Sequence, residues 1–301
     1  MSMNCVSASR QRTPWLRQTR MIQRILRRLA REERPVRFLI SRALWHGGAS
    51  RWFTVQRGGT VPGRYRVRFF PSSVSSQVWV YPERVTEEEA FVAETLRPGD
   101  TYVDVGANVG LLALRASSVV GPAGKVVAVE AHPRTATFLR ENVAMNGFDN
   151  VQVESCAVGE TRGTVSFSSR RSDDQNAVDP ARTGMEVPLV PLDELFPESR
   201  IPRVQLLKID VEGFELPALR GATALLRRVD RILIESSARH SARYGYDPRE
   251  VYALLRQAGF RLRRLGDTVD IPVDFVPTGT ENLVGERMGL GDSVGLGTDA
   301  E

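Results

Sequence analysis

The segment that most constrains this chain runs from Asp104 to Gly110 and reads D-V-G-A-N-V-G. Residues 102–105 are apolar and β-branched enough for a buried strand, and the apolar residues from Leu111 onward begin a helix. Glycines at the turn expose backbone N–H groups at the helix start and remove the Cβ atoms that would keep a ligand away. The pattern predicts a strand, a glycine turn and a helix that together bind a nucleotide-type cofactor.

The acids near this turn indicate which cofactor it binds. Glu130 follows Gly110 by twenty residues, at the end of the apolar run 126–129, where a carboxylate can accept hydrogen bonds from both ribose hydroxyls. Asp104 precedes the first glycine by two residues, and the spacing differs from the G-x-G-x-x-G of dinucleotide sites. A carboxylate there attracts the ammonium and sulfonium of S-adenosylmethionine but not a pyrophosphate. We therefore predict S-adenosylmethionine as the cofactor, with a nicotinamide-dependent oxidoreductase as the alternative.

The positive charge of the chain is concentrated at its N-terminus. Residues 1–45 hold eleven arginines and two acids, a net charge of +9, so the total of +5 leaves −4 for the remainder. This distribution argues against a basic catalytic domain that grips nucleic acid. Residues 15–31 read as a basic amphipathic helix that could contact an anionic membrane. The alternatives are an organellar presequence, a helix packed on the protein's own core, and an adaptor that docks on membrane or RNA through this arm.

Four regions follow along the chain. After the basic extension of residues 1–45 we expect a small β cap over 46–85, with short strands at 53–55, 65–69 and 78–81. The main domain spans 86–287 and opens with a helix capped by Thr86 and Glu89; residues 288–301 form a flexible tail.

The cysteines and the hydropathy pattern indicate where in the cell the protein is expected. Cys5 and Cys156 are the only cysteines, which argues for a reducing compartment, and no uncharged apolar run approaches the ~18–20 residues that span a bilayer. We therefore expect a cytoplasmic protein with peripheral membrane contact through the basic helix.

Strands and helices alternate through the main domain. The expected strands lie near 102–105, 125–130, 151–153, 204–209, 232–234, 260–265 and 281–285. This alternation predicts a doubly wound, mostly parallel α/β sheet, with the ligand crevice outside the carboxyl ends of its strands. A hairpin of strands 163–167 and 186–190 interrupts it, and the long polar connection between them is either a lid over the crevice or a surface excursion.

A second acidic segment ends the fourth expected strand. Asp210, Glu212 and Glu215 surround a glycine, and Asp210 is expected beside the first strand, near the sulfonium of the cofactor. Glu212 is expected to bind loop amides or the substrate, and Glu215 to cap the next helix. Glu235 follows the buried run 232–234 at the crevice edge. It is expected to act either as a general base or as an acceptor of hydrogen bonds from loop amides.

Four segments in the same order resemble the FkbM family of S-adenosylmethionine-dependent methyltransferases. They are residues 104–110, 130–133, 156–159 and 208–213, and the last, K-I-D-V-E-G, is the most specific. The resemblance covers roughly residues 86–285. It implies a class I methyltransferase sheet of seven strands, the last one antiparallel. It also implies methyl transfer to a hydroxyl of a sugar, glycolipid or polyketide-like acceptor.

The resemblance also implies roles for particular residues. The methionine moiety of the cofactor would be lined by Asp104, Gly106, Ala107, Asn108 and Gly110, the ribose held by Glu130, and the adenine bordered by Ser155, Cys156 and Ala157.

The candidates for catalysis are Asp210, Glu212 and Glu235, whereas His240 is expected in a solvated loop. No Cys/His cluster has the spacing of a zinc site, and no spacing of the acids requires a divalent ion, so the sequence assigns no metal ligand.

Overall fold

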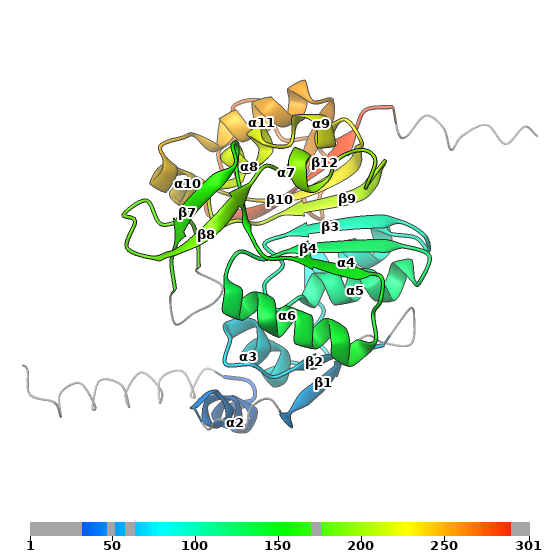
Figure 1. The fold of residues 1–301 in the computed structure, drawn as a ribbon, viewed down its shortest axis with the longest axis vertical. Helices are drawn as coiled ribbons and strands as arrows, with labels where there is room; N and C mark the ends of the chain where they lie inside the picture. The colour runs from blue at the N-terminus through cyan, green and yellow to red at the C-terminus, as the bar shows by residue number, and fades with distance from the viewer. Residues whose placement is uncertain (1–31, 47–51, 58–63, 170–175, 290–301) are drawn as a thin grey trace, which may run out of the picture.

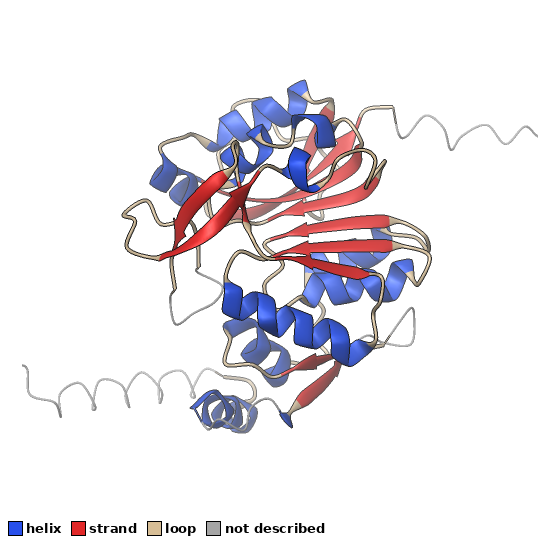
Figure 2. Cartoon of the chain, viewed as in Figure 1, coloured by secondary structure: helices blue, strands red, loops and turns tan. Residues whose placement is uncertain are grey.

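The computed structural model describes residues 32–46, 52–57, 64–169 and 176–289 (Figures 1 and 2). The predicted basic helix of residues 15–31 and nearly all of the predicted tail lie outside the described residues, so their roles stay predictions. Among the described residues, no helix has the length and apolar character to cross a bilayer.

Seven strands form the main sheet. In chain order they are β3 (Thr101–Val105), β4 (Lys125–Val129), β5 (Val151–Glu154), β9 (Val204–Ile209), β10 (Val229–Ser237), β11 (Phe260–Arg264) and β12 (Thr280–Arg287). Their spatial order is β11-β12-β10-β9-β3-β4-β5, and β12 alone among them runs antiparallel to the rest. This is the strand order of a class I methyltransferase, so the predicted fold class is confirmed.

Helices cover both faces of this sheet (Figure 1). One face carries α4 (Glu87–Thr95), α5 (Leu111–Val120) and α6 (Pro133–Asn146), and the other α8 (Glu215–Arg220), α9 (Thr223–Leu226) and α11 (Pro248–Gln257). Alternate residues of β3 show the division, since Tyr102 packs with α4 and α5 while Val103 packs with α8 and α11. Because both faces are covered, the central strands β3 and β4 are mostly apolar, and an acid stands at or just after the carboxyl end of each.

The region before α4 mixes helix and strand. It contains α2 (Pro35–His46), β1 (Thr54–Arg57), β2 (Tyr65–Arg68) and α3 (Ser73–Val80), with β1 and β2 paired antiparallel. The strand predicted at 78–81 is therefore wrong. Ser72 caps a helix there, because its side chain accepts a hydrogen bond from the Ser75 N–H, and Val74 and Val78 pack one turn apart against the core.

A buried ion pair fastens this region to the main domain. Arg57 of β1 donates to Glu89 of α4 at 2.6 Å, and the Tyr65 hydroxyl of β2 donates to the same carboxylate at 2.8 Å. Glu89 is also the third residue of the predicted capping box with Thr86, which is confirmed. The two charged side chains are at most 3% exposed, so each depends on the other for compensation of its buried charge.

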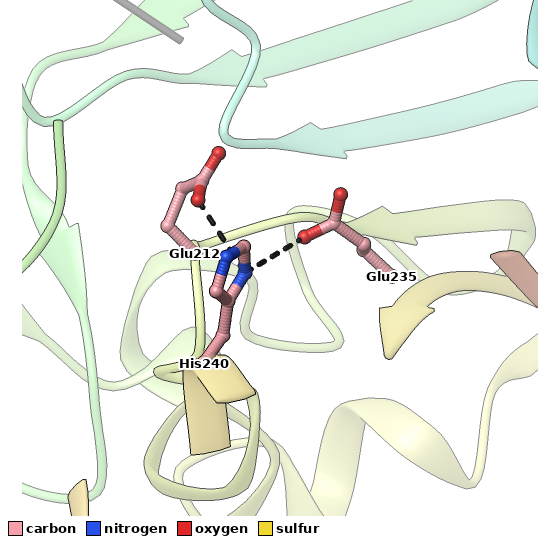
Figure 3. A group of neighbouring side chains, drawn as sticks. All are labelled: Glu212, Glu235 and His240. Carbon is pink, nitrogen blue, oxygen red and sulfur yellow. Dashed lines mark ion pairs between the residues drawn. The ribbon is translucent and has the colours of Figure 1, made fainter. Parts of the chain in front are cut away.

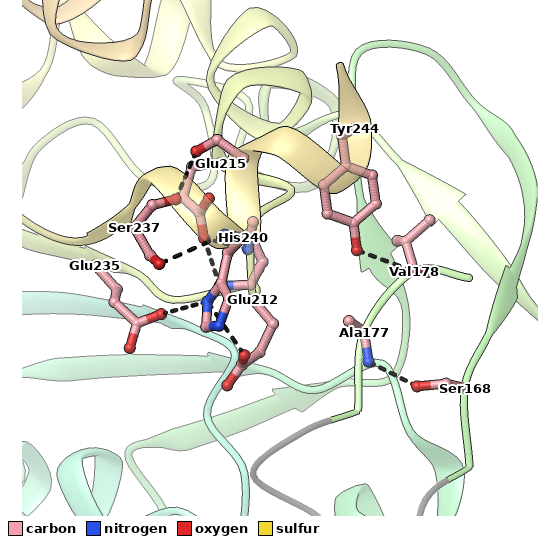
Figure 4. Close-up of polar contacts among 12 residues, drawn as sticks. Ser168, Ala177, Val178, Glu212, Glu215, Glu235, Ser237, His240 and Tyr244 are labelled. Carbon is pink, nitrogen blue, oxygen red and sulfur yellow. Dashed lines mark hydrogen bonds and ion pairs between the residues drawn. The ribbon is translucent and has the colours of Figure 1, made fainter. Parts of the chain in front are cut away.

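The predicted hairpin forms a second, smaller sheet. It consists of β6 (Ala157–Val158), β7 (Gly163–Phe167) and β8 (Met185–Val190), with β7 and β8 antiparallel and β6 added parallel to β8; α7 (Leu192–Leu195) follows. The described part of the β7–β8 connection contacts the 3-10 helix η3 (Ala242–Tyr244), which follows α10 (Ala238–Ser241), because the Tyr244 hydroxyl donates to the Val178 carbonyl at 2.8 Å (Figure 4).

Candidate functional site

A cleft of about 280 Å³ opens at the carboxyl ends of β3, β4, β9 and β10. Its walls include most residues that the sequence predicted for cofactor binding and all three predicted for catalysis; the exceptions are Gly110 and Ser155. Lys208, Gln77, Glu88 and Asn282 also line the cleft, and sequence reasoning had given none of them a role.

The glycine turn is pressed against the end of β9. Gly106 has a φ of +82°, and a Cβ on it would lie 1.8 Å from the carbonyl oxygen of Asp210. The N–H groups of Gly106 and Ala107 donate to the carbonyl of Val129, which ties the turn to β4 as well. Only a glycine allows this approach, so the first glycine is required by packing before any ligand is considered.

Gly110 has a packing role at the start of α5. It is the N-cap residue with a φ of +91°, and a Cβ on it would lie 2.2 Å from the Leu139 side chain of α6. The space beside Gly110 is therefore filled by α6, and Gly110 is not among the residues that line the cleft.

Glu130 braces the glycine turn from the end of β4. One carboxylate oxygen accepts a hydrogen bond from the Asn108 N–H at 2.9 Å, and the other accepts one from the His132 N–H at 2.8 Å. A carboxylate has about four acceptor sites, so these two bonds are compatible with the predicted contact to ribose hydroxyls. The structure thus adds a positioning role to the predicted ribose contact.

Charged side chains meet on one face of the sheet below the turn. Asp104 of β3 and Lys208 of β9 are register partners, and Lys208 Nζ lies 4.0 Å from Asp104 Oδ1 and 3.0 Å from Asp210 Oδ2. Burial raises the pKa of Asp104 to about 6, although Lys208 partly opposes the shift. Burial alone would lower the pKa of Lys208, but Asp210 and Asp104 outweigh it and hold the pKa above its usual value.

The carboxylate of Asp104 fits a cationic cofactor. The residue is 1% exposed, and neither of its oxygens accepts a hydrogen bond within the described part of the chain. Buried acceptors without donors are costly, and an ammonium group entering the cleft would supply both donors and charge. S-adenosylmethionine carries such a group, together with the methyl-bearing sulfonium that it supplies to the reaction.

Glu212, Glu235 and His240 converge at the same end of the cleft (Figure 3). His240 Nδ1 lies 3.5 Å from Glu212 Oε2 and 3.5 Å from Glu235 Oε2. Burial, together with Asp210 and Glu212, raises the pKa of Glu235 to about 9. Burial and two nearby arginines lower the pKa of His240.

The expectation of a solvated loop for His240 is wrong. The residue lies on α10 with its side chain 18% exposed, and its N–H donates to Ser237 Oγ at the helix start (Figure 4). Gly213 permits this placement, since a Cβ there would lie 2.6 Å from the His240 carbonyl oxygen. The two segments are far apart in sequence, so only the fold brings them into contact.

The expectation that Glu215 caps the next helix is wrong, because it is the first residue of α8, whose N-cap Phe214 makes no side-chain cap hydrogen bond, and it binds the preceding turn instead. Its carboxylate accepts hydrogen bonds from the N–H groups of Val211 and Gly213 at 3.3 and 3.0 Å, and from the Tyr246 hydroxyl at 3.0 Å. It therefore holds the turn that presents Glu212 to the cleft.

Polar side chains from α4 and β12 also line the cleft. Asn282 of β12 pairs with Glu235 across the sheet, and its side-chain amide donates to Glu88 Oε1 of α4 at 2.6 Å. In the sequence, Glu88 is one of three glutamates in the first turn of a helix, a common arrangement that favours the helix dipole. Nothing in that local pattern indicates a place in the cleft.

Sheet order and cleft define a methyltransferase that uses S-adenosylmethionine. The chain belongs to the FkbM family, because the model of the methyltransferase FkbM domain matches residues 104–262. The nicotinamide-dependent alternative is therefore set aside.

Two relatives that match about two thirds of the chain are less than 30% identical to it. The chain is 28% identical over 197 residues to hexuronic acid methyltransferase AglP of Haloferax volcanii, covering 64% of this chain and 77% of that protein. It is 24% identical over 233 residues to methyltransferase sdnD of Sordaria araneosa, covering 66% and 88%. Among solved structures, an FkbM methyltransferase from Methylobacillus flagellatus aligns at 18% identity with a TM-score of 0.41, covering 70% of this chain and 52% of that one.

Two glycines allow a matched test of the contact between the glycine turn and β9. Gly99 and Gly106 both have φ near +85°, but a Cβ on Gly99 meets nothing within 4 Å. We expect Gly99→Ala to lower the free energy of unfolding by about 1–2 kcal/mol, the cost of the left-handed backbone alone. Gly106→Ala should cost at least about 2 kcal/mol more and abolish cofactor binding. Urea unfolding and calorimetry measure both, and equal costs would contradict the contact.

The raised pKa of Asp104 predicts how cofactor affinity depends on pH. A cation binds the carboxylate form, so protonation competes with binding and the affinity should fall as pH drops below about 6. The loss from this group approaches about tenfold per pH unit. Asp104→Asn should bind more weakly at pH 7.5 and lack this component. Calorimetry with S-adenosylmethionine from pH 5 to 8 tests it, and parallel profiles for the two proteins would contradict the role.

Proposed function

We propose that this protein transfers the methyl group of S-adenosylmethionine to a hydroxyl oxygen of a sugar or a similar polyhydroxylated molecule, free or as part of a glycolipid. The observation that carries the proposal is the set of polar side chains in the cleft lining, namely Gln77, Glu88, Asn282 and Glu212, which can bind several hydroxyls. The relative named as a hexuronic acid methyltransferase supports a sugar acceptor. A polyketide-like acceptor would offer fewer hydroxyls to these side chains.

Charge narrows the choice of acceptor. The described residues that line the cleft include six acids and one lysine, namely Glu88, Asp104, Glu130, Asp210, Glu212, Glu235 and Lys208. The cofactor adds positive charge at the glycine turn, but Glu88 and Glu212 would keep the rest of the lining acidic. Like charges at short range repel strongly in a partly buried site, so a neutral hydroxylated acceptor fits this lining better than an anionic one.

The reaction needs position and a proton acceptor. The acceptor oxygen attacks the methyl carbon in line with the C–S bond; the O–C bond forms as the C–S bond breaks and S-adenosylhomocysteine leaves. The hydroxyl proton passes to a carboxylate, for which we propose Asp210. Asp210 follows β9 at the edge of the cleft, with its side chain 33% exposed and held by Lys208 at 3.0 Å. Glu212 and Glu235, the other predicted catalytic residues, lie on the acceptor side.

The proton acceptor can be tested with Asp210→Asn. We expect its affinity for S-adenosylmethionine to stay within about threefold of the wild type, while turnover falls about 10²-fold or more because the proton acceptor is lost. Asp230→Asn is a matched control, since Asp230 pairs with Arg203 at 2.9 Å near the opposite end of the sheet. Full activity of Asp210→Asn would exclude Asp210 from proton transfer.

The acceptor class can be tested directly with the wild-type protein. Incubation with S-adenosylmethionine and separate neutral glycosides, uronic acids and hydroxylated polyketides should yield a methyl ether only with sugars, and most rapidly with neutral ones. Mass spectrometry detects the added CH2, and the S-adenosylhomocysteine formed should match it in amount. Methylation confined to the polyketides, or to a nitrogen or carbon atom, would contradict the proposal.

A further inference from the structure

We propose that Glu212, Glu235 and His240 form a binding site for a divalent cation at the acceptor end of the cleft (Figure 3). One potential ligand atom from each side chain lies within 4.8 Å of the other two. The three side chains come from the turn after β9, the end of β10 and the helix α10. Two carboxylates and one imidazole are a donor set that first-row divalent metals accept.

The distances between the groups fit ligands around one ion. Ligand atoms placed about 2.1 Å from a metal in tetrahedral geometry lie about 3.4 Å from one another. His240 Nδ1 lies 3.5 Å from an oxygen of each glutamate, close to that spacing and too far for a good hydrogen bond to either. The three groups therefore surround a common point rather than pair directly.

The surroundings of the His240 Nδ1 atom favour a positive charge at the point between the three side chains. Nδ1 is buried and makes no hydrogen bond within the described part of the chain, and it faces two carboxylates. Whichever of these three groups holds a proton, contacts of 3.5 Å are too long for a good hydrogen bond between them. A metal ion satisfies all three groups, whereas a single proton on Nδ1 would form two long contacts.

The backbone around these ligands is held by its own contacts. Glu212 has a φ of 56°, an uncommon value outside glycine, and the next turn is fixed by hydrogen bonds to Glu215. His240 is placed by the cap at Ser237 and by its close approach to Gly213. Ligands held in this way need little rearrangement to bind an ion.

A bound cation would change which acceptor molecules fit the cleft. This effect on the acceptor rests on the proposed function, whereas the binding of the metal does not. The cation would offset part of the charge of the six acids in the lining. Its open coordination positions would bind adjacent hydroxyls or the carboxylate of an acidic sugar. The imidazole predicts a preference for Mn²⁺ or Zn²⁺ over Mg²⁺, which favours oxygen ligands alone.

Mn²⁺ binding to the full chain, freed of metal with a chelator, tests the site. Electron paramagnetic resonance of free Mn²⁺ should show one ion bound per chain, displaced by Zn²⁺ more readily than by Mg²⁺. His240→Ala, Glu212→Gln and Glu235→Gln should each weaken the binding about tenfold or more. Glu88→Gln is the matched control, because it removes a carboxylate from the same cleft without removing a ligand. It should leave the Mn²⁺ affinity within about twofold.

Calorimetry with S-adenosylmethionine on every variant identifies the variants that fold. The Mn²⁺ affinities are compared among the folded variants. Absence of stoichiometric Mn²⁺ and Zn²⁺ binding to the wild type would overturn the proposal. So would equal Mn²⁺ affinities in the three ligand variants and Glu88→Gln, which would indicate general attraction to an acidic cleft. Failure of the proposed function would appear separately, as missing methyl ether product with Mn²⁺ binding intact.

Discussion

The buried ammonium of Lys208 is the constraint on which the site depends. An isolated charge in the protein interior costs several kcal/mol, so it persists only beside carboxylates that offset it. Asp104 on β3 and Asp210 after β9 supply them, at 4.0 and 3.0 Å. The parallel pairing of β3 with β9, which places these strands at the centre of the sheet, brings the three groups together. The same arrangement leaves Asp104 with unsatisfied oxygens that face the cleft.

The cleft is assembled from parts that are each fixed by separate contacts. The glycine turn is tied to β4 by backbone hydrogen bonds and braced by Glu130. The N-terminal region is fastened to α4 by the Arg57–Glu89 pair, so Gln77 of α3 and Glu88 of α4 keep their places in the cleft wall. Electrostatic catalysis works best in a site that does not reorganise during the reaction, and these contacts provide that rigidity. We infer that cofactor and acceptor meet on a preformed surface.

Local sequence patterns predicted most of the elements. The Thr86–Glu89 capping box, the strand and glycine turn at 101–110, and the hairpin of β7 and β8 are all present. The capping box and the glycine turn depend on contacts within a few residues, and each strand of the hairpin shows its own apolar pattern, so local sequence encodes them. The prediction failed at 78–81, where short apolar runs fit a helix or a strand equally well and Ser72 decided the outcome as a helix cap.

The sequence by itself determined the strand, turn and helix around Asp104, the acid at the end of each central strand, and the family to which the chain belongs. Tertiary structure alone decided which of these acids meet. His240 lies between Glu212 and Glu235, and Asn282 reaches Glu88, because sheet order and the packing of α10 and β12 place them there. Such contacts join residues far apart in sequence, and the free energy that selects them is that of packing the whole core. No local propensity carries that information.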